Sequence, residues 1–189
     1  MGAVALRLEG LEGDEQADLK AHGGPDKAVC CYPAEHIPSW ERAIGAPLPA
    51  GAFGENLRVS GVREDQVCLG DVFTIGTGVV QISQPRGPCF KLAARWGLRD
   101  LPARMAQAGI SGWYVRVLQP GTIQAGDGLR LQQRTSEISI AEVMRVTYRD
   151  RRDTQAIEAV LAASSLAPAW QATLHKLARH PQQEPNFGG

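Results

Sequence analysis

One cysteine of this chain lies in a setting that favours its reactive form. Cys89 follows a proline and lies between Arg86 and Lys91, in the run Gln84–Lys91 (QPRGPCFK). Neighbouring cations favour the thiolate, which is the form of cysteine that attacks electrophiles or binds metals. Pro88 fixes its own φ angle and restricts the residue before it, so we expect a stiff turn. The run predicts either a rigid platform for one activated sulfur, with two cations ready for an anion, or a half-buried cysteine at a strand-to-helix turn.

A second group of polar side chains surrounds two glycines, in the run His22–Lys27 (HGGPDK). Gly23 and Gly24 permit positive φ angles and a close approach of the backbone to a ligand. Successive amides in such a turn can bind an anion, and Lys27 and the His22 imidazole add donors. The alternative is a hairpin connection with solvated charges. No second histidine lies near His22, so a multi-histidine metal site is not expected.

Two further clusters carry groups that suit a binding site. In the run Phe53–Leu57 (FGENL), Glu55 and Asn56 could point polar groups into a cleft, or Asn56 could bond the backbone of a turn before a strand. Trp113 and Tyr114 could form a flat wall beside an aromatic ligand, although aromatic residues at the start of a strand are more often part of the core.

The composition excludes several classes of protein. Lys plus Arg and Asp plus Glu both number 20 among 189 residues, and this zero net charge argues against a dedicated nucleic-acid binder. There is no secretory segment and no apolar run of membrane-spanning length, so we expect a cytoplasmic protein without a membrane partner. The four cysteines form no C-x-x-C pair, which fits free thiols in a reducing compartment and not a zinc ribbon.

Short strands separated by turns position these clusters. Alternating apolar and polar residues predict a strand at Val4–Leu8, and an apolar run predicts a short buried strand at Ala28–Tyr32. Further short strands between turns are predicted at Asn56–Val59, Gln66–Leu69, Val72–Ile75, Val79–Ser83, Trp113–Leu118 and Leu129–Gln133. Strands this short and frequent indicate a closed or nearly closed β-barrel, with helices between some of them at 35–43, 89–96 and 100–108.

The composition changes after Arg134, where glycine is absent until the tail and helical periods begin. The capping-box pattern Ser139–Glu142 precedes three short amphipathic helices. We therefore divide the chain into a barrel domain at 1–134, a three-helix unit at 135–180 and a flexible tail at 181–189.

Taken in order, these motifs resemble the MOSC-domain family (the molybdenum cofactor sulfurase C-terminal domain), and in particular its small bacterial YiiM-like branch. The resemblance covers nearly the whole chain. It implies a mainly β fold with α: a MOSC-type β-barrel, like the barrel domain of pyruvate kinase, with flanking helices and a C-terminal three-helix unit. Members usually have a further strand ahead of the first motif, so we expect the barrel to lack that strand or to close differently. The motifs are Leu11–Asp18, His22–Val29, Phe53–Leu57, Gly70-Asp71, Gln84–Lys91 and Gly112–Leu118.

The resemblance also implies a site. Cys89 would bind the molybdenum of a molybdopterin cofactor, and Arg86 and Lys91 would neutralise part of the charge of that cofactor. The other implied cofactor contacts are His22, Gly23, Gly24, Lys27 and Asn56.

The implied reaction is the two-electron reduction of N-hydroxylated compounds, such as hydroxylaminopurines and other hydroxylamines: R-NH-OH, two electrons and two protons give R-NH2 and water. Proton donors would be His22, Asp26 or Glu55. Electrons would come from a separate reductase, which we expect to use flavin, and the chain could form a homodimer. Two alternatives stay open: a carrier module that holds cofactor or sulfur on Cys89 without catalysis, and a metal-free thiol enzyme with His22 as its base.

Overall fold

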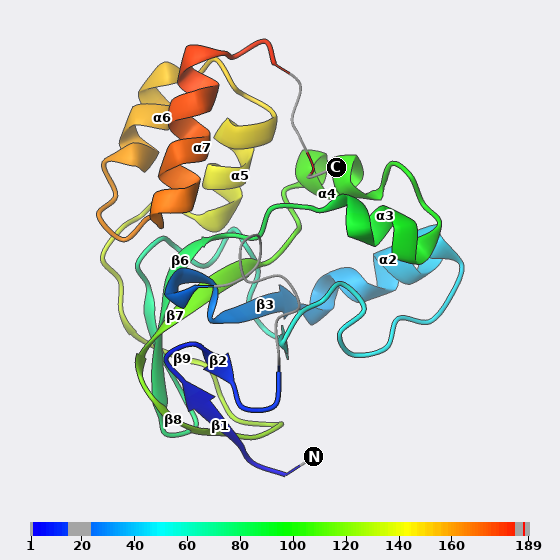
Figure 1. Cartoon of the computed structure of the whole chain (residues 1–189), viewed down its shortest axis with the longest axis vertical. Coiled ribbons are helices and arrows are strands. Elements are labelled where there is room, and N and C mark those ends of the chain that lie inside the picture. The colour runs from blue at the N-terminus through cyan, green and yellow to red at the C-terminus, as the bar shows by residue number, and fades with distance from the viewer. Residues whose placement is uncertain (1, 15–23, 184–186, 188–189) are drawn as a thin grey trace.

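The chain forms a curled β half-barrel that is joined to helices at two places (Figure 1). The structure is a computed structural model, and it describes residues 2–14, 24–183 and 187. Six strands form the main sheet in the order β4-β3-β7-β6-β5-β9, and a smaller sheet has the order β2-β1-β8. All neighbouring strands pair antiparallel except β3 and β4, which are parallel. The strands are β1 Val4–Arg7, β2 Gly10–Leu11, β3 Val29–Pro33, β4 Leu57–Val59, β5 Val72–Ile75, β6 Gly78–Pro85, β7 Trp113–Gln119, β8 Gly121–Ile123 and β9 Arg130–Gln133.

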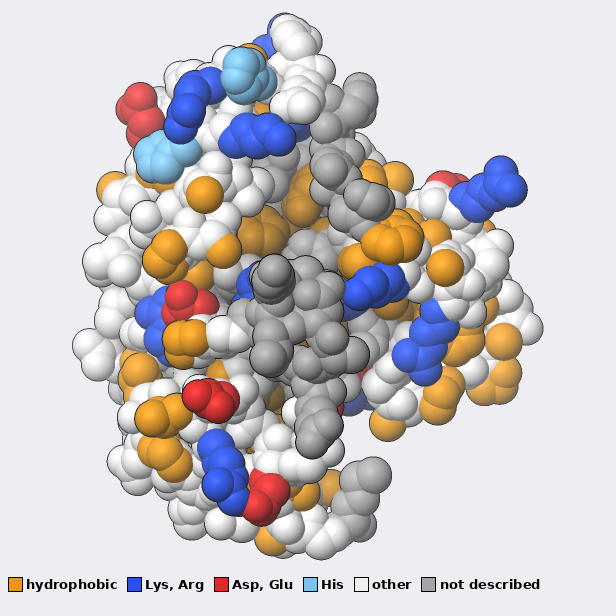
Figure 2. Space-filling view, in the orientation of Figure 1, with side chains coloured by type: hydrophobic (Ala, Val, Ile, Leu, Met, Phe, Trp, Pro, Cys, Tyr) orange, Lys and Arg blue, Asp and Glu red, His pale blue; other side chains and the backbone are white. Residues whose placement is uncertain are grey.

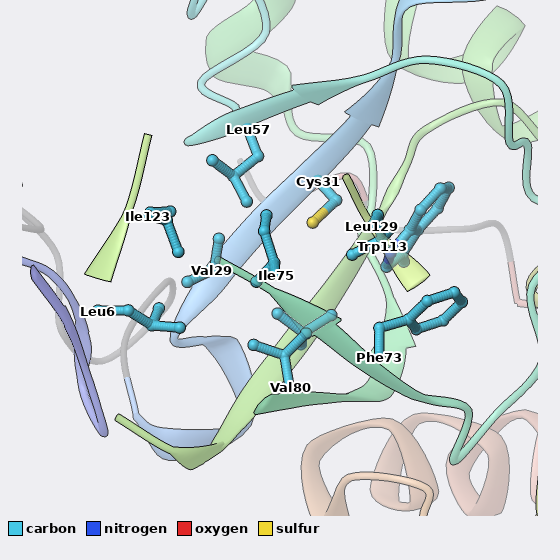
Figure 3. Close-up of a pocket in the computed structure, with 11 residues that line it drawn as sticks. Leu6, Val29, Cys31, Leu57, Phe73, Ile75, Val80, Trp113, Ile123 and Leu129 are labelled. Carbon is cyan, nitrogen blue, oxygen red and sulfur yellow. The ribbon is translucent and has the colours of Figure 1, made fainter. Parts of the chain in front are cut away.

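The half-barrel encloses an apolar core and not a ligand site. Side chains from β1, β3, β5, β6 and β7 point toward one another there, among them Leu6, Phe73 and Trp113 (Figure 3). The space left between them is about 10 Å³ and is lined almost entirely by apolar atoms. A space of this size and polarity is too small and too dry for a polar ligand. The barrel interior therefore serves stability, and the functional site has to lie elsewhere.

Two groups of helices flank the sheet. The 3-10 helix η1 (Pro25–Lys27) precedes β3. The first group of helices follows β3 and β6 and contains the 3-10 helix η2 (Ala34–His36), α2 (Ile37–Ile44), α3 (Phe90–Trp96) and α4 (Leu101–Ala108). Tyr32, Trp40, Phe53, Leu101 and Met105 form a second apolar core among them. The C-terminal group is α5 (Ile140–Tyr148), α6 (Thr154–Leu161) and α7 (Pro168–Arg179), which lie together at one end of the molecule (Figure 1).

The predicted fold class is confirmed, including the three C-terminal helices. Ser139 begins α5 as its N-cap and accepts a hydrogen bond from the Glu142 amide at 3.1 Å, as the capping-box pattern predicts. Asp100 precedes α4, but its carboxylate pairs with Arg104 and caps no amide. Within the predicted tail, the Phe187 ring stacks on Tyr148 and the Phe187 carbonyl accepts a hydrogen bond from the Phe90 amide at 3.0 Å.

One predicted strand is wrong, and two were not predicted. Residues 66–69 form no strand, because their backbone partners lie at the start of α5 and just before it, where only an isolated bridge forms. The Leu69 amide donates to the Ile138 carbonyl, and the Ile140 amide donates to the Val67 carbonyl. The short strands β2 and β8 were missed because they carry only two or three residues, too few for a period to show.

The surface agrees with the balanced composition. On the face drawn in Figure 2, Lys and Arg side chains lie among acidic and apolar side chains and do not form one continuous basic surface. Arg145 illustrates this, since its guanidinium binds Glu142, Asp150 and Asp153. Among the helices of the described residues, none combines the length and apolar character needed to cross a membrane.

Candidate functional site

The Cys89 turn connects the end of β6 to the start of α3. The last four residues of β6 are buried, and its register with β7 shifts between Ile82 and Gln84. Such a bulge bends a strand and redirects the residues after it. Cys89 itself is extended (φ −124°, ψ 143°), half-buried, and immediately precedes α3. The predicted strand, turn and helix around this cysteine are thus present.

Cys89 lies on an open cavity of about 280 Å³ between the half-barrel and the first helix group. The cavity combines aromatic and apolar walls with three cations and few acidic groups, and a combination of this kind suits an anionic ligand with a flat apolar part. Its lining residues are Asp14, Cys30, Phe53, Gly54, Asn56, Arg86, Cys89, Lys91, Leu92, Arg95 and Tyr114.

Arg86 is the most deeply placed cation of the cavity. It is 7% exposed, and its Nη2 donates to the Phe53 carbonyl. Its Nη1 is buried and has no hydrogen-bond partner among the described residues. Because a buried N–H without an acceptor is costly, this atom calls for an acceptor that a bound anion would supply. The residues present therefore fit an anionic group such as a phosphate or a metal dithiolene.

Two further residues line the cavity beside Arg86: Cys30, which was not predicted as a site residue, and Tyr114, which the sequence suggested as a wall beside an aromatic ligand. Cys30 on β3 and Tyr114 on β7 are cross-strand partners, and both line the cavity. Burial raises the pKa of the Cys30 thiol to about 11, although Arg86 acts in the opposite direction. Burial also raises the pKa of the Tyr114 phenol and Cys30 raises it further, whereas the charge of Arg86 and the contact of its side chain with the phenol lower it. At neutral pH both groups are therefore neutral donors. The alternation of the strands gives the signal that could have found Cys30, since the neighbours of these two residues, Cys31 and Trp113, face the barrel core.

Helix α3 adds two cations at the cavity wall. Lys91 was predicted, and Arg95 was not, although it follows Lys91 by one helical turn on the same face. Arg95 Nη1 donates to the Gly51 carbonyl at 3.1 Å, and its guanidinium lies 5.4 Å from the centre of the Trp96 ring. These contacts hold the Arg95 side chain over the edge of the cavity.

Asn56 lines the cavity and also bonds the backbone, which were the two roles that the sequence left open for it. Its Oδ1 accepts a hydrogen bond from the Cys30 amide at 2.6 Å, and its Nδ2 donates to Asp14. These contacts place Asp14, from the first motif, on the cavity wall.

Glu55 is buried, but its carboxylate does not line the cavity. Its oxygens accept hydrogen bonds from the amides of Gly51 and Phe53 and from Arg58, whose Nη2 lies 2.8 Å away. These hydrogen bonds of the carboxylate fix the conformation of the loop whose residues Phe53 and Gly54 line the cavity.

The His22–Lys27 motif is described only in part. His22 and Gly23 lie outside the described residues. Gly24 has φ +99°, in the range that favours glycine, and precedes η1. Asp26 does not line the cavity, and its carboxylate instead pairs with Arg116 at 2.7 Å. Lys27 is half-buried and is likewise absent from the cavity lining.

No cluster of three or more His, Cys, Asp or Glu side chains that could enclose a metal ion occurs in residues 2–14, 24–183 and 187. All four cysteines are free thiols. A metal at Cys89 would therefore need most of its ligands from another source, such as the dithiolene of a cofactor.

The chain is similar to known families and proteins along most of its length. Residues 18–130 match the MOSC domain family, and residues 138–178 match a family described as "YiiM-like, 3-alpha helix domain". The chain is 47% identical over 175 residues to "Uncharacterized protein YflK" of Bacillus subtilis (strain 168), which covers 92% of this chain and 79% of that protein.

Two further similarities bear on the fold and on the chemistry. A crystal structure of YiiM from Geobacillus stearothermophilus superposes with a TM-score of 0.83 at 41% identity, covering 94% of this chain and 85% of that one. A protein named "Reductase" from Gibberella moniliformis (strain M3125 / FGSC 7600) is 38% identical over 151 residues, which cover 77% of this chain but only 27% of that protein.

Proposed function

Because this chain belongs to the MOSC-domain family, we propose that it binds a molybdenum cofactor in the Cys89 cavity and reduces N-hydroxylated compounds to amines. The observation that carries the proposal is the placement of a half-buried free thiol and a buried, incompletely bonded guanidinium on one cavity. A thiolate is a soft ligand, and a cationic setting favours an anionic cofactor beside it.

Different residues of the cavity would contact different parts of the cofactor. The Cys89 sulfur would bind the metal from a turn whose prolines restrict its direction. Arg86 would donate its Nη1 to an anionic oxygen or sulfur, and Lys91 and Arg95 would balance charge at the wall. Asn56 keeps the Cys30 strand and Asp14 in place beneath them. We propose His22 and Gly23 as further contacts to phosphate or pterin. The expected contacts of Gly24 and Lys27 are not proposed again, because neither residue lines the cavity.

The bound cofactor would supply the two electrons of the reduction. The chain has to deliver two protons and to orient the N–O bond. We propose His22 as a proton donor. Asp26 and Glu55 were also predicted as donors, but their carboxylates are engaged by Arg116 and Arg58, so we assign them positioning roles instead. Phe53 and Tyr114 offer aromatic walls to a planar N-hydroxylated base.

We further propose that a separate flavin reductase supplies the electrons. The relative named "Reductase" matches this chain over only about a quarter of its own length. A domain of this type can therefore be one part of a longer redox protein.

The test begins with the full chain from a molybdenum-replete host. We expect molybdenum and pterin in near-equal molar amounts, and reduction of N-hydroxylaminopurine with a reduced viologen dye as electron source. The Cys89→Ser variant should lose at least tenfold of its molybdenum and activity. Cys68→Ala, a buried cysteine outside the cavity, serves as the matched control and should keep both.

The outcomes separate the alternatives. A Cys89→Ser variant that keeps its molybdenum and full activity contradicts the ligand assignment. Cofactor or persulfide on Cys89 without any N-reductase activity indicates a carrier module. A thiolate adduct with neither metal nor pterin indicates a metal-free thiol enzyme.

A further inference from the structure

A buried histidine–glutamate pair lies behind the Cys89 turn, outside the cavity lining. Glu64, in the connection between β4 and β5, is 2% exposed. Its Oε2 lies 2.7 Å from His36 Nε2, and the side chain of His36 is 12% exposed. Burying a carboxylate is costly unless the group is fully bonded, and a buried pair of this kind often contributes little net stability. The pair therefore calls for an explanation other than stability alone.

The other carboxylate oxygen of Glu64 leads to the Cys89 turn. Glu64 Oε1 accepts a hydrogen bond from the Gly112 amide at 2.8 Å. The Gly112 carbonyl in turn accepts one from the Arg86 amide at 3.0 Å. The carbonyl of Arg86 is bonded as well, since it accepts a hydrogen bond from the Ser111 hydroxyl. Residues 111 and 112 thus hold both backbone groups of Arg86, and Glu64 holds residue 112.

Gly112 can take this place only because it has no side chain. Its φ is +79°, and a Cβ atom there would lie 2.3 Å from the Cys31 carbonyl oxygen. The backbone of residue 112 is therefore confined between β3 on one side and the Glu64 carboxylate on the other.

The partner of Glu64 is also held firmly. The His36 ring meets the Tyr32 ring edge-on, with centres 5.9 Å apart. The Tyr32 hydroxyl accepts a hydrogen bond from Trp40 Nε1 at 2.7 Å. His36 therefore lies against a fixed aromatic ring. Glu64 connects His36 to the Gly112 amide, and each of its two carboxylate oxygens makes one of these contacts.

We propose that Glu64, held by His36, is a positioning residue that sets the backbone of Arg86 through Gly112 and thereby fixes the direction of the Cys89 sulfur. The proposal rests on the proposed role of the Cys89 turn. The decisive property is the reach of the side chain and not its charge, because one oxygen must contact Gly112 while the other end contacts His36.

Two substitutions separate reach from charge. Glu64→Asp keeps the charge but shortens the side chain by one methylene, so it cannot make both contacts from the same backbone position. Glu64→Gln keeps the length, and its amide can donate to His36 while its oxygen accepts from Gly112. Asp71→Ala is the matched control: Asp71 is also fully buried, accepts an amide hydrogen bond (Cys68, 2.8 Å) and pairs with a cation (Arg134, 2.9 Å), but away from the cavity.

The readout is the alkylation rate of Cys89 by iodoacetamide, resolved by peptide mass spectrometry, in full chains from a host that makes no molybdopterin. A loosened turn exposes the half-buried sulfur, so Glu64→Asp should raise the rate at least fivefold. Glu64→Gln and Asp71→Ala should stay within twofold of the unmodified chain, although Asp71→Ala should lower the melting temperature. In a molybdenum-replete host, Glu64→Asp should also retain at least fivefold less molybdenum than Glu64→Gln.

Three results would overturn the proposal: an unchanged Cys89 rate in Glu64→Asp, an equal change in Glu64→Gln, or an equal change in Asp71→Ala. If Glu64→Asp does not fold, amide hydrogen exchange in the unmodified and Glu64→Gln chains decides, since the Gly112 and Arg86 amides should exchange equally slowly in both. Rapid exchange of the Gly112 amide in either chain counts against the proposal. The alkylation rate needs no metal, so it stays informative even if Cys89 proves not to bind molybdenum.

Discussion

Two thiols line the same cavity but differ in their setting. Cys30 is 2% exposed on a central strand, whereas Cys89 is half-buried on a turn. Because burial raises the pKa of Cys30 to about 11, this thiol stays protonated at neutral pH and can only donate weakly. Cys89 is thus the better placed of the two for metal binding, and Cys30 belongs to the wall that faces the ligand.

The raised pKa of Cys30 predicts a loss of stability in alkaline solution. The unfolded chain releases the proton near pH 9.0, whereas the folded chain keeps it until about pH 11, so stability is fully present below pH 9 and declines between these values. At pH 10 the loss from this one group is about 1.4 kcal/mol. Cys30→Ala should therefore lose about 1 kcal/mol less than the unmodified chain between pH 7 and pH 10, in urea unfolding.

Other buried groups contribute in this range, among them Cys31 and Tyr114: the unfolded chain releases their protons there, whereas burial raises their pKa values in the folded chain. The test is therefore the difference between the two chains and not the pH dependence of either one. Equal losses in both chains would mean that Cys30 is not desolvated as the structure indicates.

Much of the site at this scale could be predicted from the sequence. Arg86, Cys89 and Lys91 are neighbours in the chain, and the turn brings all three to the cavity. Asp26 and Glu55 could not be judged in the same way, because their partners Arg116 and Arg58 compete with the cavity for the carboxylates. A carboxylate in a sequence motif indicates that a negative charge has a role there. Only the fold shows with which cation the carboxylate pairs.

At the scale of elements, the loop between α2 and β4 forms one wall of the cavity. Phe53 and Gly54 line the cavity, and Glu55 ties the loop to Arg58 behind it. Arg58 also donates to the carbonyls of Leu48 and Pro49, so the whole loop closes around one ion pair. The loop is therefore shaped by this pair and not by regular secondary structure.

Glu55→Gln should accordingly act on the wall and not on the chemistry. Weakening the ion pair leaves the Arg58 guanidinium partly uncompensated, and we expect a loss of about 2 kcal/mol of stability and weaker cofactor retention. Activity per bound molybdenum should change less than threefold, whereas loss of a general acid typically costs on the order of 100-fold or more. A loss of that size per bound molybdenum would restore Glu55 as a proton donor.

Element boundaries followed the sequence where packing reinforces the local pattern. The strand at Val72–Ile75 has the predicted bounds, because its apolar residues are buried and it pairs with a strand on each side. The segment 66–69 has the same apolar character, but its hydrogen-bond partners lie beside α5, more than 60 residues away in the chain. A single sequence shows a propensity for extended backbone, and it does not show which segment will complete the ladder.

At the scale of the whole molecule, the half-barrel and the C-terminal helices share one hydrophobic core. Leu69, Ile82 and Trp113 of the barrel side belong to the same cluster as Met144 and Trp170 of the helices. Polar contacts cross the same boundary: Arg116 on β7 binds Asp26 and Gln81 and donates to the Ser165 carbonyl at 2.8 Å. The three-helix unit is therefore a part of the barrel's fold, although it has its own sequence signature.

The shared core predicts that the barrel cannot fold without the helices. A chain of residues 1–134 loses all the helical members of the core and exposes the apolar surface they cover, and exposed apolar surface of this kind promotes aggregation. We expect that chain to be insoluble or to lack a cooperative transition, whereas the full chain unfolds in one thermal transition. A chain that ends at residue 183 keeps α7 complete and should melt within a few degrees of the full chain, at about the same cooperativity. A soluble 1–134 chain with a cooperative melt would show that the two parts are independent domains, and the Cys89 turn, which packs near Tyr148 and Trp170, would then need no support from the helices.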